Sequence, residues 1–153
     1  MLALFVAVSL AINPILPNAT LTPGSINPAV TQANIQQTIC KPNFTSTIRP
    51  PASYTTKLKL KQLASGYAIN KDMNPADYEE DHLISLEIGG NPTDPKNLWP
   101  EPYAGTTGAR IKDQVENKLH ALVCAGTMPL ATAQKLIAKN WWSAYQTYVA
   151  VKK

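Results

Sequence analysis

Residues 78–99 read YEEDHLISLEIGGNPTDPKNLW, and this stretch decides how we expect the chain to fold. Its apolar residues and irregular alternation predict a β-strand over residues 78–88, and the Gly-Gly-Asn-Pro run at 89–92 predicts the end of that strand. The short piece 97–99 predicts a second strand that stops at Pro100. Two strands in this order predict a hairpin with a long connection.

The chain after this hairpin has the spacing of two amphipathic helices. Apolar residues recur every three or four positions from Ile111 to Leu122, which predicts a helix that ends at Gly126. Residues 131–148 predict a C-terminal helix whose aromatic side chains we expect in the core rather than on a stacking surface. The whole pattern predicts an α+β fold, with a hairpin-helix core over residues 78–123.

The segment before the hairpin is rich in Pro, Thr, Asn and Ser. We expect residues 20–53 to form an extended arm with turns that wraps around the domain. Residues 55–63, TTKLKLKQL, predict a short helix capped by Thr55 or Thr56, although its three lysines also alternate as they would in a strand. The simplest interpretation of these lysines is a solvated face, and contact with phosphates is the alternative.

Length and charge limit the function classes. The 153 residues, 44% of them apolar, are enough for one compact domain, which we place at residues 20–153. The chain has 14 Lys and Arg against 10 Asp and Glu, a formal net charge of +4. This mild excess favours a polyanionic partner without identifying one.

The N-terminal residues stand apart because no charged residue precedes Lys41. Residues 2–12, LALFVAVSLAI, match the apolar segment of a secretory signal and are too short to span a bilayer. We therefore expect residues 1–19 to be a signal peptide or apolar leader. The mature protein would then be secreted or periplasmic, without stable membrane association. A buried N-terminal strand or helix is the alternative, but the prolines at positions 14 and 17 would cut it short.

The two cysteines, Cys40 and Cys124, are far apart and lack the C-x-x-C spacing of a zinc knuckle or redox pair. A single long-range disulfide fits an exported protein and would tie the arm to the later helices. Two buried free thiols are the alternative if the leader is not a signal.

The pair Asp81-His82 carries the clearest chemistry in the chain. A neutral imidazole can take a proton from water, and a carboxylate beside it can hold a hard divalent cation through oxygen. Hydrolysis of a phosphodiester needs both functions. Adjacent residues of a strand point to opposite faces, so a common centre predicts a twist or bulge at this pair.

Residues 81–102, DHLISLEIGGNPTDPKNLWPEP, resemble the HNH branch of the His-Me finger (ββα-metal) nucleases. In that family an Asp-His pair opens the first strand, a glycine-containing loop follows, and an Asn-Leu pair comes before a helix that supplies the last metal ligand. Asp81-His82, Gly89-Gly90 and Asn97-Leu98 match in this order. With the arm and the last helix, the chain looks like the small exported bacterial members of this group.

The resemblance implies a ββα-metal core in which His82 is the catalytic base, Asp81 binds the metal, and Asn97 orients the hairpin loop and the imidazole. It also implies one divalent metal ion, Mg²⁺ or Mn²⁺. Two positions depart from the family pattern. Ser85 stands where a proline is common, and the usual His or Asn is missing from the first turn of the helix.

If the site is active, Asp113 or Glu116 must therefore supply the last ligand; the alternative is that the ligand is another residue of the chain. Glu116 is our first choice because it lies at the flank of the apolar helix face, whereas Asp113 projects nearly opposite. Asp113 remains the alternative because it lies closer to the start of the helix. Lys112 is a candidate for binding the substrate phosphate, with an ion pair to Glu116 at i,i+4 as the competing interpretation. We expect His120 to lie outside the site.

These features predict a monomeric, exported HNH-type endonuclease that hydrolyses DNA with little sequence preference, with RNA left open as a further substrate. The nucleic acid would be double-stranded DNA contacted through its backbone. A non-catalytic, disulfide-stapled binding module and a toxin-like nuclease effector are the rival hypotheses.

Overall fold

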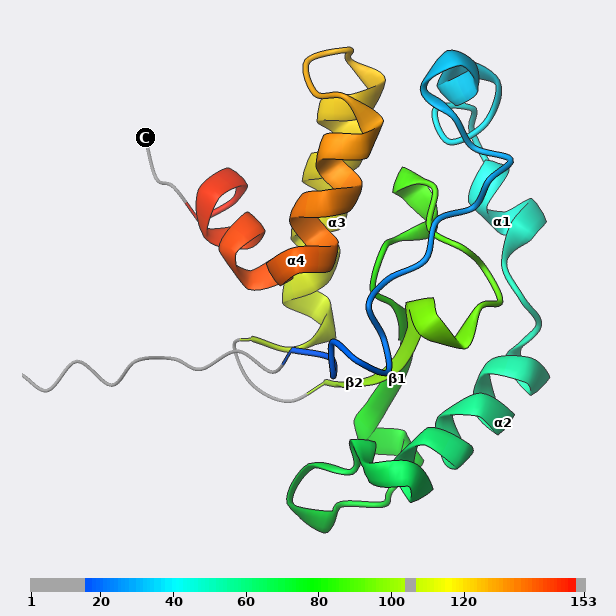
Figure 1. The fold of residues 1–153 in the computed structure, drawn as a ribbon, viewed down its shortest axis with the longest axis vertical. Coiled ribbons are helices and arrows are strands. Elements are labelled where there is room, and N and C mark those ends of the chain that lie inside the picture. The colour runs from blue at the N-terminus through cyan, green and yellow to red at the C-terminus, as the bar shows by residue number, and fades with distance from the viewer. Residues whose placement is uncertain (1–15, 104–106, 151–153) are drawn as a thin grey trace, which may run out of the picture.

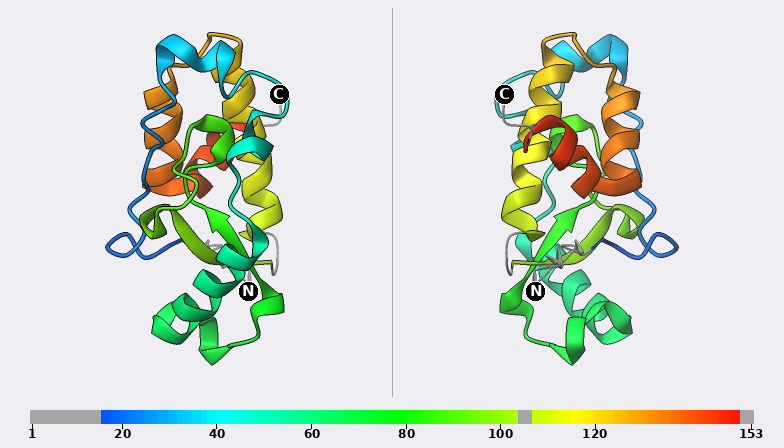
Figure 2. Two further views of the ribbon diagram at one scale, coloured as in Figure 1. Left: turned by 90° about the vertical axis from the view of Figure 1, so that its right-hand side faces the viewer. Right: turned by 90° about the vertical axis from the view of Figure 1, so that its left-hand side faces the viewer.

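The computed structural model describes residues 16–103 and 107–150 of the chain. It combines helices with a two-stranded antiparallel sheet, which confirms the α+β class (Figure 1). The sheet lies between the pair α3 and α4 at one end of the molecule and α2 at the other (Figure 2). The main elements are α1 Phe44–Ile48, α2 Ala52–Gln62, β1 Tyr78–His82, β2 Leu98–Pro102, α3 Ala109–Cys124 and α4 Leu130–Tyr148.

The apolar leader predicted for residues 1–19 falls, up to residue 15, outside the described residues. Within the described part, no helix has the length and apolar character needed to cross a membrane.

The hairpin pairs β1 with β2, with Tyr78 opposite Pro102 and His82 opposite Leu98. The prediction of a strand over 78–88 was wrong in its end, because β1 stops at His82 and a short 3₁₀ turn follows at Leu86–Ile88. The second strand does not stop at Pro100. Both strands are sheet edges, where a missing proline N–H costs no ladder hydrogen bond.

The hairpin loop (residues 83–97) is held tightly against its surroundings. The arm runs along it, since Asn27 N donates to Gly89 O and Asn91 N donates to Ser25 O, both at 2.8 Å. A Cβ added to Gly90 would lie 1.7 Å from the Ile84 carbonyl oxygen, so only glycine fits there. The loop is therefore a packed part of the domain.

The arm is extended with turns, as predicted, but it also contains a 3₁₀ helix at Gln32–Gln37 and the short α1. The helix predicted for residues 55–63 is confirmed as α2. Its predicted cap was wrong, because α2 begins three residues earlier and follows Pro51, which makes no side-chain cap bond. Proline suits this position because its φ is fixed near the value that starts a helix.

The lysines of α2 do not share one solvated face. The ammonium of Lys59 is partly buried and donates to the carbonyls of Pro75 and Tyr78, each at 2.8 Å. Lys57 and Lys61 are exposed. Lys59 therefore ties α2 to the start of β1.

The core lies between α3 and α4, which run side by side in both views (Figures 1 and 2). Val115 and Leu119 of α3 pack in one buried cluster with Ile137 and Trp141 of α4. The prediction that the aromatics of the last helix belong to the core is confirmed for Trp141, which is fully buried. The helix breaks at Asn140, and the Asn140 side chain restarts it by accepting the Ser143 N–H.

A disulfide joins Cys40 of the arm to Cys124 at the end of α3, across 84 residues of sequence. This confirms the predicted bridge. It closes a long loop, which restricts the unfolded chain and fixes the arm to the core.

We expect Cys40→Ser to lower the free energy of unfolding by about 2–5 kcal/mol, because the loop is no longer closed in the unfolded state. Urea unfolding followed by circular dichroism measures the change. Cys40→Ser/Cys124→Ser is the matched control and should lose the same amount. Two freely alkylated thiols in the oxidised wild-type protein would contradict the bridge.

Candidate functional site

His82 closes β1, and one ring nitrogen is fixed by the hairpin loop. Its Nε2 lies 2.9 Å from the carbonyl oxygen of Pro92. A carbonyl oxygen only accepts, so Nε2 carries the proton and Nδ1 keeps a free electron pair. His82 is only 5% exposed. Burial lowers the pKa of His82 below its ordinary value, so the ring is neutral near neutral pH.

Asn97 holds the loop that carries Pro92. Its amide is fully buried, and Oδ1 accepts from Ile84 N at 2.9 Å and from Ser25 N at 3.3 Å. Its Nδ2 donates to the carbonyls of Ile84 and Asn91, both at 3.0 Å. Asn97 is the last residue of the 3₁₀ turn Pro95–Asn97. The prediction that it lies on the second strand was therefore wrong. These four bonds cross-link both ends of the loop with the arm.

The backbone at Asp81-His82 is more regular than predicted. Asp81 pairs with Trp99 and His82 with Leu98 without a bulge. The irregularity comes after His82, where the strand ends and the chain turns into the loop. Asp81 and His82 therefore point to opposite faces, as adjacent residues in a strand do.

Lys112 is the centre of the Asp81 face. Its side chain is fully buried, and Nζ donates to Asp81 Oδ2 at 2.6 Å, to the His82 carbonyl at 2.8 Å, and to Glu116. Burial alone would lower the pKa of Lys112, but the charges of Asp81, Glu116 and Glu101 outweigh it and raise the pKa above its ordinary value. The ammonium is therefore permanently charged.

The buried Lys112 ammonium affects the site roles predicted for the three α3 residues Lys112, Asp113 and Glu116. Glu116 is 8% exposed and Asp113 is exposed, so Glu116 does lie on the inner side of the helix. The Lys112 ammonium, however, stands between Asp81 and Glu116. All three of its N–H groups are used, so it has none to offer a phosphate. Of the two interpretations of Lys112, the structure shows the ion pair with Glu116, in buried form.

Glu101 is a buried carboxyl that the sequence analysis did not single out. Register and strand alternation put it on the same face as Glu79 and Asp81. It is 1% exposed, and neither carboxyl oxygen has a hydrogen-bond partner. Burial, followed by the charge of Asp81, raises the pKa of Glu101 well above its ordinary value. Burial and the Asp81 charge therefore both favour the protonated form of Glu101.

Glu79 and Glu80, which precede Asp81, are half-buried. Burial, followed by the charges of Asp81 and Asp113, raises the pKa of Glu79. Burial, followed by the charge of Asp81, raises the pKa of Glu80 to about 8. Carboxyl groups are thus crowded around Asp81.

Arg49 is a second residue that the sequence analysis missed. It is exposed at the end of α1, and its positive charge contributes to lowering the pKa of both His82 and Glu79. The arm therefore supplies a cation near the imidazole. No local sequence signal marks Arg49, because its position follows from the path of the arm.

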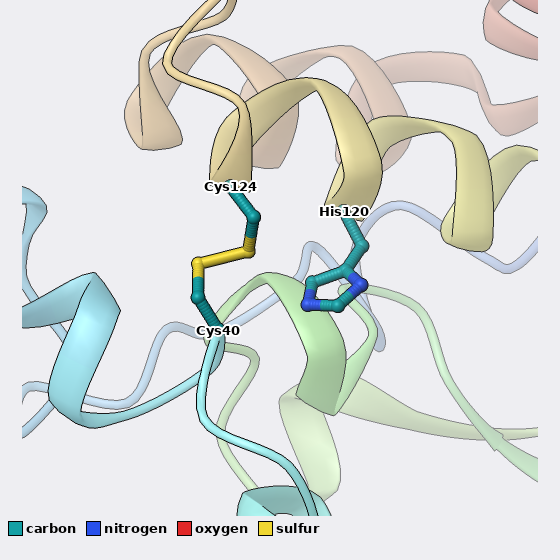
Figure 3. Close-up of side chains that lie close together, drawn as sticks. All are labelled: Cys40, His120 and Cys124. Atoms are coloured by element: carbon teal, nitrogen blue, oxygen red, sulfur yellow. A yellow bond between two sulfur atoms is a disulfide. The ribbon is translucent and has the colours of Figure 1, made fainter.

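A separate cluster lies where the arm meets the end of α3. Cys40, His120 and Cys124 place one potential ligand atom each within 4.8 Å of one another (Figure 3). In residues 16–103 and 107–150 no other group of three or more His, Cys, Asp or Glu side chains meets this criterion. The Asp81 carboxyl cluster is therefore not arranged as a ready three-ligand metal site.

Comparisons with known proteins leave the function to be argued from this geometry. No family model, curated protein or solved structure matches the chain.

We expect Lys112→Met to lower the free energy of unfolding by about 3–5 kcal/mol, because it leaves the buried carboxylates of Asp81 and Glu116 without a counter-charge. Urea unfolding measures the loss. Lys112→Met/Glu116→Leu should recover part of it, since one of these carboxylates is removed.

The exposed Lys57→Met is the matched control and should change stability by less than about 0.5 kcal/mol. If Lys112→Met were as mild as Lys57→Met, Lys112 would not hold this centre together.

Proposed function

We propose that the protein is a metal-dependent endonuclease of the ββα-metal type that hydrolyses the backbone of double-stranded DNA with little sequence preference. The observation that carries this proposal is the His82 imidazole, which is neutral, fixed through Nε2 and left with a free electron pair on Nδ1. Such a group can act as a general base toward water near neutral pH. Export and a monomeric state, inferred from the sequence, belong to the same proposal.

The order of elements supports the ββα arrangement. β1 ends in Asp81-His82, the hairpin loop returns through Asn97 to β2, and α3 follows. α3 then contacts the hairpin through Lys112, which bonds both Asp81 and the His82 backbone. A helix thus faces the catalytic pair, as the resemblance to the HNH nucleases implies.

The carboxylates around Asp81 are suitable ligands for a hard divalent cation, but the cation cannot bind at every point among them. A cation held jointly by Asp81 and Glu116 would have to displace the Lys112 ammonium. The outer side of Asp81 fits better, because only Oδ2 is bonded to Lys112 and Asp113 lies near this side. Burial, followed by the charge of Asp81, raises the pKa of Asp113. We therefore place the metal on Asp81 and Asp113. Mg²⁺ commonly uses one or two carboxylates and completes its shell with water and phosphate.

Charge supports the need for such a cation. The described centre gathers Glu79, Asp81 and Asp113 at its accessible side, while the Lys112 charge is buried and already paired. A polyanion is repelled by this surface unless a cation neutralises it. When bound, the metal would stabilise the negative charge that develops on the phosphate.

Residues of the chain would supply the other functions that hydrolysis needs. His82 takes a proton from the attacking water at Nδ1, and the Pro92 carbonyl keeps the Nε2 proton in place. Lys112 fixes the orientation of the Asp81 carboxylate. Arg49 is the cation best placed to contact a phosphate of the substrate beside His82.

One observation favours the rival hypothesis of a non-catalytic binding module. The Lys112 ammonium is already paired with Asp81 and Glu116. The family resemblance assigns Asp81 to the metal, and Glu116 was our first choice for the ligand from the helix. A fold stabilised in this way needs no metal. Cleavage assays separate the two functions.

We expect the purified protein to nick and then linearise supercoiled plasmid with Mg²⁺ or Mn²⁺, and EDTA to stop the reaction. His82→Ala should lower the cleavage rate by about 10²–10⁴-fold, the usual contribution of a general base. Gel quantification of the plasmid forms measures both effects.

Asp113→Asn tests the metal position in the same assay. It should weaken cleavage with partial rescue at high Mn²⁺, while the exposed Lys57→Met should leave the rate unchanged. A wild-type protein that binds DNA but cleaves none in several metals would favour the binding module. Full activity of His82→Ala would remove His82 as the base.

A further inference from the structure

The cluster of Cys40, His120 and Cys124 joins two segments that are distant in sequence. His120 and Cys124 lie one turn apart on α3, and Cys40 comes from the arm (Figure 3). All three side chains are partly exposed, and their potential ligand atoms lie within 4.8 Å of one another. In the oxidised protein both sulfurs are consumed by the disulfide.

We propose that this cluster is a redox-linked zinc site, in which reduction of the disulfide allows both thiolates and the His120 imidazole to bind one Zn²⁺. Thiolate and imidazole are the ligands that Zn²⁺ prefers in proteins. The inference is independent of the proposed nuclease activity, because the cluster shares no residue with the Asp81 centre.

The chemistry balances with a phosphine as reductant. The phosphine takes the oxygen of one water and becomes a phosphine oxide, the S–S bond breaks, and the two hydrogens of that water end on the two sulfurs. Binding of Zn²⁺ then releases these two thiol protons to solvent, because the metal binds thiolates.

The spacing suits a metal after small side-chain rotations. With Zn–S of about 2.3 Å and Zn–N of about 2.0 Å in a tetrahedron, neighbouring ligand atoms lie about 3.5–3.8 Å apart. The reduced sulfurs of Cys40 and Cys124 must separate to this distance. Their Cα atoms, 5.6 Å apart, need not move far for this.

A carboxylate, Glu87, lies near the second ring nitrogen of His120, although not within hydrogen-bond distance. The Nδ1 of His120 lies 3.6 Å from Glu87 Oε2, and its Nε2 lies 2.9 Å from the carbonyl oxygen of Ile39. A carboxylate that accepts from one ring nitrogen commonly orients the other toward zinc. Because the Ile39 carbonyl only accepts, Nε2 carries the proton in the oxidised protein. Binding of the metal therefore requires the proton to move to Nδ1, which faces Glu87, and Nε2 to leave Ile39.

The site is accessible to solvent and to small reagents. A cavity of about 320 Å³ is lined by Cys40, Glu87 and His120 together with residues of the arm. A water molecule in this cavity can fill the fourth position of the zinc. Oxidised and reduced forms would then both attach the arm to α3, one by a covalent bond and the other through the metal.

The test uses the full chain, reduced with a phosphine and freed of metal under anaerobic conditions. Titration with Co²⁺ should produce the thiolate-to-cobalt absorption band of a tetrahedral site at one equivalent, and Zn²⁺ should abolish this band by displacement. Added Zn²⁺ should also raise the Tm of the reduced protein. The oxidised protein should show no such band.

His120→Ala is the matched variant, because it keeps both cysteines and removes the third ligand. It should weaken Co²⁺ binding by at least about tenfold, and Glu87→Gln should weaken it less. Equal affinity in His120→Ala, or no thiolate band in reduced protein that remains folded, would overturn the proposal. Reduced protein that is unfolded and does not refold with Zn²⁺ would overturn it as well.

Discussion

The buried side-chain amide of Asn97 is the constraint on which the hairpin depends. Its four hydrogen bonds join the end of β1, the middle of the hairpin loop and the arm, in a place that water does not reach. A buried amide must be satisfied, so the loop can close in only a few ways. Gly90 is required for the same closure, since a side chain there would strike the Ile84 carbonyl. This closure sets the position of the Pro92 carbonyl and, through it, the tautomer of His82.

The Lys112 ammonium is the second link, because it connects the hairpin to α3. A buried cation is tolerated only when its charge and all its donors are matched, and Asp81, Glu116 and the His82 carbonyl do this. The same contacts hold Asp81 still. They also exclude a metal from the space between Asp81 and Glu116, which places the proposed cation toward solvent. The Asp81 carboxylate thus pairs with Lys112 and is also a ligand of the proposed metal.

Sequence reasoning succeeded where the signal is local. Helical spacing predicted α3 and the buried Trp141, and the order of short motifs predicted a hairpin followed by a helix. It failed where tertiary contacts decide the local structure. β1 ends at His82 because the backbone N–H and carbonyl of Ile84 form hydrogen bonds with the Asn97 side chain instead of with a neighbouring strand. Lys112 shares the buried stripe of Val115 and Leu119 by its spacing, but its charge led us to consider a phosphate contact. The buried pairing of such a lysine depends on β1, which no helix pattern reveals.

The most direct test of this account is the tautomer of His82, read from a long-range ¹H–¹⁵N correlation spectrum of ¹⁵N-labelled protein. The chain has two histidines, so His120→Ala assigns the signals. The account predicts a neutral ring with the proton on Nε2 and a bare Nδ1. Because burial lowers its pKa, this ring should stay mostly neutral at about pH 6.5, where an ordinary histidine is half protonated. A proton on Nδ1, or a charged ring at that pH, would contradict the proposed base.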